Sequence, residues 1–84
     1  SDDFEKVRAN LQSSRTTVDE ALGQMGVEVL ASSVSCFITV KGIEASQINS
    51  LVQAAGSALT GHYESGNIFG VDDAVQFAVS ASTD

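Results

Sequence analysis

Side chains that could bind a metal ion gather between residues 57 and 77. His62 is the only histidine of the chain, Glu64 follows two positions later, and the acid pair Asp72-Asp73 comes next. Structural zinc sites mostly use four cysteine or histidine ligands at tight spacings, and calcium loops need a denser run of oxygen ligands than this segment offers. The spacing favours a solvated turn, so we expect no metal site and no cofactor.

Residues that could catalyse hydrolysis occur in positions that do not suit the reaction. A nucleophilic serine needs a sharp strand-to-helix turn, whereas Ser57 falls near the end of a predicted helix. Asp72 and Asp73 are adjacent, and adjacent side chains on a strand point to opposite faces, so they cannot act together across a cleft. We expect this pair to protect a strand entrance from edge-to-edge pairing. The sequence thus predicts no catalytic residue and a protein that is not an enzyme.

Cys36 is the only cysteine of the chain, so an internal disulfide is impossible. One interpretation is a small apolar residue packed in the core on the face of Val34, Ile38 and Val40. The other is a thiol paired with another chain. No cationic residue flanks Cys36 to stabilise a reactive thiolate.

The candidate contact surface consists of His62, Tyr63 and Glu64, which follow one another directly. The N-terminal helix is a second candidate, as a face for a partner chain. Tyr63 and Phe69 could act as surface aromatics in recognition. With four phenylalanines and one tyrosine in the chain, however, we expect both of them inside.

Two amphipathic helices are predicted to position these residues. Residues 2–25 carry one apolar stripe that ends near Gly26, and the polar run 13–17 leaves open one broken helix or two short ones. Residues 44–59 form the second helix, with Ser46 as its N-terminal cap and Gly61 after its end. The stripes contain Phe4, Val7, Leu11, Val18, Leu22 and Met25 in the first helix, and Ile48, Leu51, Val52, Ala55 and Leu59 in the second.

Alternation with a period of two predicts the strands. Residues 34–41 alternate strictly, and Val27 and Val29 either begin this strand or form a shorter one before a break at Ser32-Ser33. The later extended segments are 62–65, 68–71 and 73–81, with a turn at 65–67 between the first two.

This order of elements predicts one domain over residues 1–84. The fold class is α+β: a two-layer sandwich in which an antiparallel sheet carries two helices on one face, built on a split βαβ unit. A domain of this size buries only about 60–65% of the surface that its unfolded chain exposes. The core is therefore thin, which suits a chain that has a partner.

The charge distribution excludes one class of partner. The net charge is −7, and the four basic residues Lys6, Arg8, Arg15 and Lys41 all lie in the first half of the chain. Nucleic-acid binding needs clustered basic side chains, so we expect no nucleic acid as a partner. An anionic membrane approached through charge is disfavoured for the same reason.

Residues 54–77, AAGSALTGHYESGNIFGVDDAVQF, resemble part of the killer toxin chains of smut fungi. The similarity consists of a helix ending in small residues, an aromatic next to an acid, a glycine turn, an acid pair and a Gln-Phe. The matching positions are Ala54-Ala55, Tyr63-Glu64, Gly66, Asp72-Asp73 and Gln76-Phe77. Residues 42–51, GIEASQINSL, are similar to a segment of salt-mediated yeast killer toxins.

The resemblance implies a secreted, antifungal, non-enzymatic toxin that acts on the cell wall and membrane of sensitive yeast or fungal cells. Its implied partner is a second toxin chain from the same precursor, which would make a heterodimer. The smut toxins are rich in disulfides, so the single Cys36 departs from their pattern. The alternative is a small protein-interaction module or a pilin-like head domain, because CFITVKGIEASQINSLV (36–52) resembles the strand-helix step of some type IV pilin heads.

Overall fold

The computed structural model describes residues 2–30 and 36–81. The predicted break at Ser32-Ser33 and the predicted strand residue Val34 lie outside these residues. The elements are α1 (Asp2–Met25), β1 (Glu28–Val29), β2 (Phe37–Lys41), α2 (Ala45–Ala55), the 3-10 helix η1 (Gly56–Ala58), β3 (Leu59–Ile68) and β4 (Val71–Val79).

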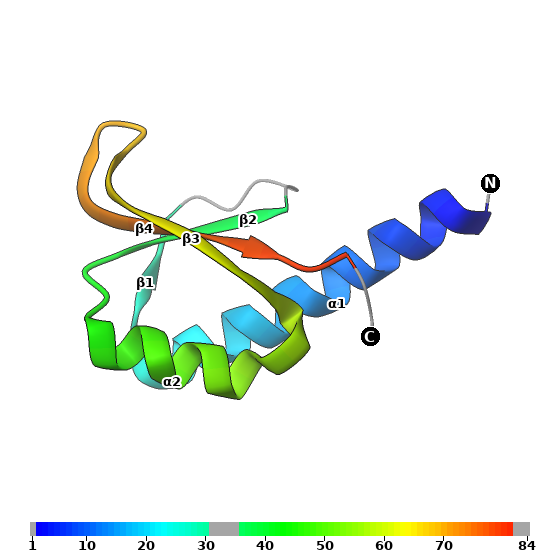
Figure 1. The fold of residues 1–84 in the computed structure, drawn as a ribbon, viewed down its shortest axis with the longest axis horizontal. Helices are drawn as coiled ribbons and strands as arrows, with labels where there is room; N and C mark the ends of the chain where they lie inside the picture. Colours follow the sequence, from blue (N-terminus) through cyan, green and yellow to red (C-terminus); the bar gives the residue numbers. More distant parts are fainter. Residues whose placement is uncertain (1, 31–35, 82–84) are drawn as a thin grey trace.

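The four described strands form one antiparallel sheet in the order β1-β2-β4-β3. The chain leaves β2, passes through α2 and returns as β3, while β4 lies between these two strands (Figure 1). This arrangement is the predicted split βαβ unit. The short strand β1 extends the sheet beyond β2, so Val27 and Val29 belong to a segment that precedes the main strand rather than to the strand itself.

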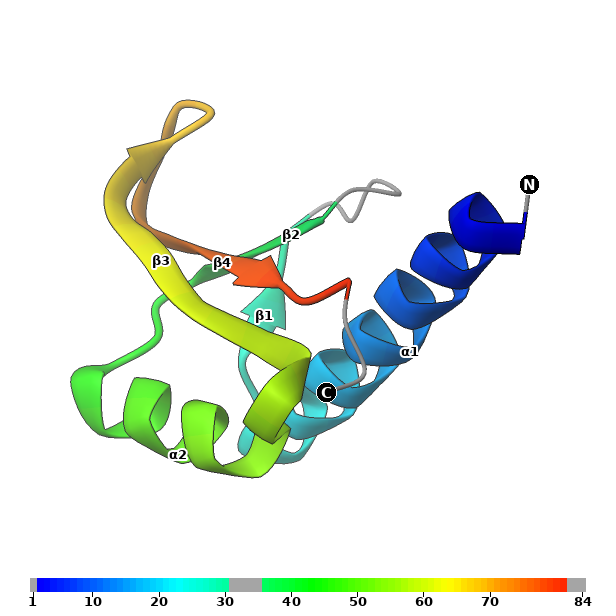
Figure 2. The same ribbon diagram turned by 45° about the vertical axis from the view of Figure 1, so that its right-hand side comes forward.

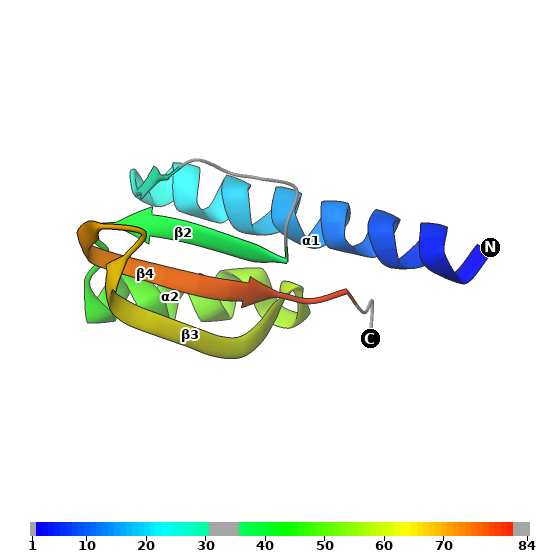
Figure 3. The ribbon, with the colours of Figure 1, turned by 90° about the horizontal axis from the view of Figure 1, so that it is seen from above.

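Both helices cover the same face of the sheet, and the sheet and the helices form two layers (Figure 3). The predicted α+β sandwich is therefore confirmed. The core lies between the layers, because alternate residues of β2 and β4 point toward the helices. Its largest fully buried side chains are Phe77, Leu22, Ile38, Leu51, Val18 and Val40.

The part of α1 from Leu11 onward packs against this core, whereas residues 3–9 are exposed. Val18 and Leu22 are 0% exposed, whereas Phe4 is 65% and Val7 is 45% exposed on the same stripe. The first half of α1 extends past the edge of the sheet (Figure 2). From the sequence, the whole stripe was predicted to face the core. The part that contains Phe4 and Val7 does not, because no other described element lies opposite it.

The helix α1 runs unbroken through its polar middle, so neither a broken helix nor two short helices form. The hydroxyls of Thr16 and Thr17 donate to the carbonyl oxygens of Gln12 and Ser13, at 3.0 and 3.1 Å. These bonds satisfy the hydroxyls inside the helix instead of starting a new one. The helix ends at Met25, and Gly26 follows with a φ of 72°.

The second helix is shorter than predicted, and the residues at its two ends differ from the predicted caps. It begins after Glu44, whose backbone N–H donates to Oε1 of Gln47 at 2.9 Å, so Ser46 is not the cap. It ends at Ala55, because Gly56 adopts a φ of 55° and a ψ of −126°. The segment 59–61, predicted as the helix end, is already the start of β3.

The strands β3 and β4 form a hairpin whose turn lies at Phe69 and Gly70. The turn predicted at 65–67 is wrong, since β3 passes through Gly66 with an irregular register and continues to Ile68. Phe69 and Gly70 have φ values of 53° and 80°. Two consecutive residues with positive φ make the tight turn that matches the twist of a hairpin.

Candidate functional site

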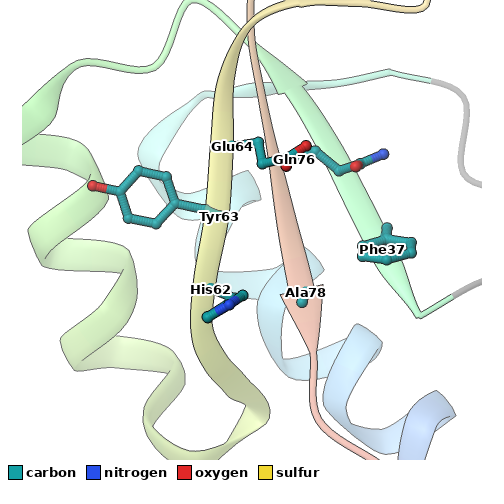
Figure 4. A pocket seen from close by; sticks show the side chains of 6 residues that line it. All are labelled: Phe37, His62, Tyr63, Glu64, Gln76 and Ala78. Carbon is teal, nitrogen blue, oxygen red and sulfur yellow. The ribbon is translucent and has the colours of Figure 1, made fainter.

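The second face of the sheet, which neither helix covers, carries a shallow cavity of about 180 Å³. Its walls come from the three strands that form the middle and one edge of the sheet. Phe37 of β2 lies opposite Ala78 of β4, and Gln76 of β4 lies opposite Glu64 of β3. The lining residues are Phe37, His62, Tyr63, Glu64, Gln76 and Ala78 (Figure 4).

The structure separates the three residues of the predicted contact surface. Tyr63 lies opposite Phe77, and the centroids of these rings are 5.6 Å apart, so the Tyr63 ring points to the helix-covered face. His62 and Glu64 come before and after it and therefore point to the open face. Figure 4 shows the Tyr63 side chain directed away from the other labelled side chains. Of these three residues, therefore, only His62 and Glu64 direct their side chains to the open face.

The open face carries few polar contacts between its described side chains. Gln76 Nε2 donates to Thr39 Oγ1 at 3.5 Å, which is the upper limit for a hydrogen bond. In residues 2–30 and 36–81, no group of three or more His, Cys, Asp or Glu residues could hold a metal ion. Within the same residues, no buried side-chain nitrogen or oxygen is left without a hydrogen-bond partner.

Cys36 is exposed just before β2, so the interpretation of a buried core residue is wrong. Its carbonyl oxygen accepts a hydrogen bond from the N–H of Val79 at 2.8 Å, which ties the backbone to the end of β4. Because side chains alternate along a strand, residue 36 lies on the same side as Ile38, which faces the helices. At the end of the sheet, however, the thiol remains open to solvent, and its pairing with another chain stays a prediction.

Of the other residues considered for catalysis, Ser57 lies in η1, whereas Asp72 and Asp73 lie next to each other at the start of β4. Ser57 is an exposed residue of η1, between a helix and a strand, and not on a strand-to-helix turn. Asp72 Oδ1 accepts from Asn67 Nδ2 at 2.8 Å, which assigns it to the hairpin. Asp73 has a φ of 56°, and its carbonyl oxygen accepts from the N–H of Gly42 at 3.0 Å.

Three exposed phenylalanines were not anticipated as surface residues. Phe69, at the hairpin turn, is 86% exposed, and the expectation that it lies inside is wrong. Phe4 on the outer part of α1 and Phe37 on the open face are 65% and 43% exposed. A sequence signal existed for Phe69, because it directly precedes a glycine between two extended segments. For Phe37 the signal was the strict alternation, which places it on the face of Thr39 and Lys41. Tyr63, at 49% exposure, is also only partly inside.

No helix in the part of the chain that the structure describes is long and apolar enough to cross a membrane. Comparison of the chain with protein-family models, with curated proteins and with solved structures finds no match.

Proposed function

We propose that this domain is a non-enzymatic subunit that binds another protein through the outer half of α1, as a pilin-like head domain would. One observation carries the proposal: the apolar stripe of α1 continues beyond the core. At one end of the stripe Leu22 is 0% exposed, and at the other end Phe4 is 65% exposed. An amphipathic helix gains stability by burying its apolar face, so this uncovered half is suited to a partner.

The charge of the outer half of α1 supports the same proposal. Residues 2–15 contain the acids Asp2, Asp3 and Glu5 and the bases Lys6, Arg8 and Arg15, which balance to zero. The rest of the chain carries the whole net charge of −7. The segment 2–15 therefore lacks the net negative charge of the rest of the chain, which favours the approach of another acidic protein from this side.

The strand-helix step that resembles pilin heads also supports a pilin-like subunit. Residues 36–52 contain β2, a short connection, and the first part of α2. Their order is the strand followed by the helix that the resemblance implies. Such a head would display its sheet and hold its place in an assembly by the long helix.

Photo-crosslinking in the producing organism tests the proposed contact. A crosslinking side chain at Val7 should give adducts whose second component, identified by mass spectrometry, is one defined partner or another copy of this chain. The matched control is Ala9, which is exposed but lies on the opposite side of α1. Equal adducts from both positions, or a scattered mixture from Val7, would refute binding through the stripe.

The sequence of the full precursor tests the pilin-like part of the proposal. A prepilin leader and a hydrophobic helix before residue 1 would support it. A secretory signal peptide together with dibasic cleavage sites would instead support a toxin. The two outcomes exclude each other, and neither depends on how the crosslinking result turns out.

A secreted killer-toxin-like chain is the second candidate, and the exposure of Cys36 favours it. An exposed thiol and an exposed helical stripe are the two features that a second toxin chain would cover. In this proposal the heterodimer acts on the wall and membrane of sensitive yeast or fungal cells, without catalysis. A growth-inhibition zone on a yeast lawn would support it, and no zone from the two chains together would count against it.

A further inference from the structure

The strand β3 forms one edge of the sheet and leaves its outer side open. It stands last in the strand order, so no described strand lies beyond it, and every residue from 60 to 67 is exposed. Natural sheets protect such edges with lysine, proline or irregular pairing. The segment 59–68 contains no lysine or proline, and its irregular register leaves Tyr63 to Gly66 in regular pairing with β4. This central part of β3 can therefore accept another strand.

Contacts within the chain occupy the opposite edge of the sheet. The short strand β1 pairs with the last two residues of β2. Before that pair, the carbonyl oxygen of Thr39 accepts from the N–H of Leu30 at 2.8 Å. The carbonyl oxygen of Phe37 accepts from the guanidinium of Arg15, also at 2.8 Å. These contacts take up carbonyl oxygens along β2, whereas the middle of β3 stays exposed.

Hydrogen bonds of β4 show which of its residues bond toward β3. The N–H of Val79 donates to the carbonyl oxygen of Cys36, on the β2 side, at 2.8 Å. The carbonyl oxygen of Ala78 instead accepts from Thr60 Oγ1, on the β3 side, at 3.3 Å. The direction of the main-chain groups alternates along a strand, so every second residue from Ala78 backwards bonds toward β3.

This alternation determines the orientation of Tyr63. Gln76, two residues before Ala78, directs its main-chain groups toward β3 and exchanges hydrogen bonds with Glu64, which lies directly opposite. Tyr63 is the neighbour of Glu64, so its N–H and C=O point away from β4 to the edge. Its ring packs on Phe77 on the helix-covered face and is 49% exposed. Tyr63 thus combines outward main-chain groups with an aromatic ring that is only partly covered.

The side chains on either side of Tyr63 are complementary to those of a second copy. If two β3 strands pair antiparallel with the two Tyr63 residues opposite each other, His62 of each copy lies opposite Glu64 of the other. An imidazole can donate to a carboxylate in either protonation state. Moving one copy by two residues in either direction would place the two Glu64 or the two His62 side chains opposite each other, and like charges in that position are unfavourable.

We propose that two copies of this chain dimerise by antiparallel pairing of their β3 strands about a two-fold axis at Tyr63. The two four-stranded sheets then form one continuous sheet. Both copies use the same edge, so the assembly stops at two, and the short paired segment makes the dimer weak. The inference goes beyond the proposed function, because α1 lies on the β2 side of the sheet and remains exposed in the dimer (Figure 3).

Sedimentation velocity at protein concentrations up to about 1 mM tests the dimer with charge variants. His62→Glu places acids opposite each other twice and should lower the association constant by about tenfold or more. Adding Glu64→Lys to this variant exchanges the two charges and should restore the dimer. Gln12→Glu is the control, because it adds one acid at an exposed position of α1, away from β3. All three positions are exposed, so the variants should keep their fold.

A mixture of two deficient variants tests the register. The acidic variant is His62→Glu, and the basic variant combines His62→Lys with Glu64→Lys. Each repels its own copies, but in a mixed pair every acid lies opposite a base, so together they should form a dimer that neither forms alone. A mixture that stays monomeric, or a charge exchange that does not restore the dimer, would overturn pairing about Tyr63.

Hydrogen exchange followed by NMR tests the main-chain pairing in the native chain. The Tyr63 amide should exchange slowly at high protein concentration and fast on dilution, while the Glu64 amide, bonded to β4, should be protected at both. Fast exchange of Tyr63 at every concentration, or a native chain that is always monomeric, would overturn the inference and leave the edge to an extended segment of a different protein. Crosslinking at Val7 tests α1 separately, so either proposal can fail without the other.

Discussion

Substitutions on the two ends of the α1 stripe should have very different effects on stability. Leu22 and Phe4 share this stripe, but Leu22 is 0% exposed and Phe4 is 65% exposed. Leu22→Ala leaves a cavity among packed side chains, and such changes cost about 2–5 kcal/mol. Phe4→Ala removes a ring that mostly contacts water, and exposed substitutions of this kind stay within about 0.5 kcal/mol. Alanine favours the helix at both positions, so helix propensity does not explain the difference.

The size of the Leu22 effect is large for this chain. A domain of 84 residues has a free energy of unfolding of about 4–13 kcal/mol. A loss of about 3 kcal/mol should lower the melting temperature by about 12–24 °C. Phe4→Ala should leave it within about 4 °C of the native value.

Urea unfolding followed by circular dichroism measures both variants, at a protein concentration low enough to keep the chain monomeric. The dependence of the free energy on urea should be unchanged, because the surface exposed on unfolding is nearly the same. If Phe4→Ala costs as much as Leu22→Ala, the outer half of α1 packs inside the folded monomer. A cost below about 1 kcal/mol for Leu22→Ala would refute the assigned core.

Three further predictions concern single local features. Gly56→Ala should lower the free energy of unfolding by about 1–3 kcal/mol, because Gly56 has a φ of 55° and a ψ of −126°. Gly23→Ala within α1 should instead raise it by about 0.5–1 kcal/mol. Thermal melting of both variants checks this contrast. Gln47→Ala should lower the free energy of unfolding by about 1 kcal/mol, because it removes the acceptor for the Glu44 N–H, while Gln47→Glu keeps an acceptor and should keep the stability. Equal losses of stability in the two variants would show that this hydrogen bond is unimportant. Cys36 should react with a thiol reagent equally fast in the folded and the unfolded chain, because it is exposed; strong protection in the folded state would contradict its position.

The order of the elements could be predicted from periodicity, since helices and strands repeat their apolar residues at different spacings. The extent of the core could not. The apolar stripe runs from Phe4 to Leu22 with one polar position, and spacing alone does not say where the opposing sheet ends. Among the residues that the structure describes, Ser14 is the one buried polar side chain, and it lies near the point where the exposed part of α1 begins. A polar interruption of an apolar stripe is thus the nearest sequence signal for that boundary.

The hairpin shows a different limit of prediction from sequence. Gly66 and Gly70 both permit a positive φ, and either can mark a turn. The choice depends on cross-strand pairing, which sets Ile68 opposite Val71 and leaves Phe69 and Gly70 to connect them. The same pairing separates Tyr63 from His62 and Glu64. The candidate contact surface was therefore predicted as a sequence segment, while its division between two faces required the register.

The position of β4 also has a consequence for how the protein is made. Of the four described strands, β4 is the last to leave the ribosome, yet it is the one that pairs with both β2 and β3. A nascent chain that ends before residue 71 has its two neighbouring strands separated by an empty strand position. Ile38 and Val40 then lack their cross-strand neighbours Phe77 and Val75 until β4 has been synthesised, so this part of the core stays incomplete. Completion of the fold is thus coupled to translation of nine residues at the middle of the sheet.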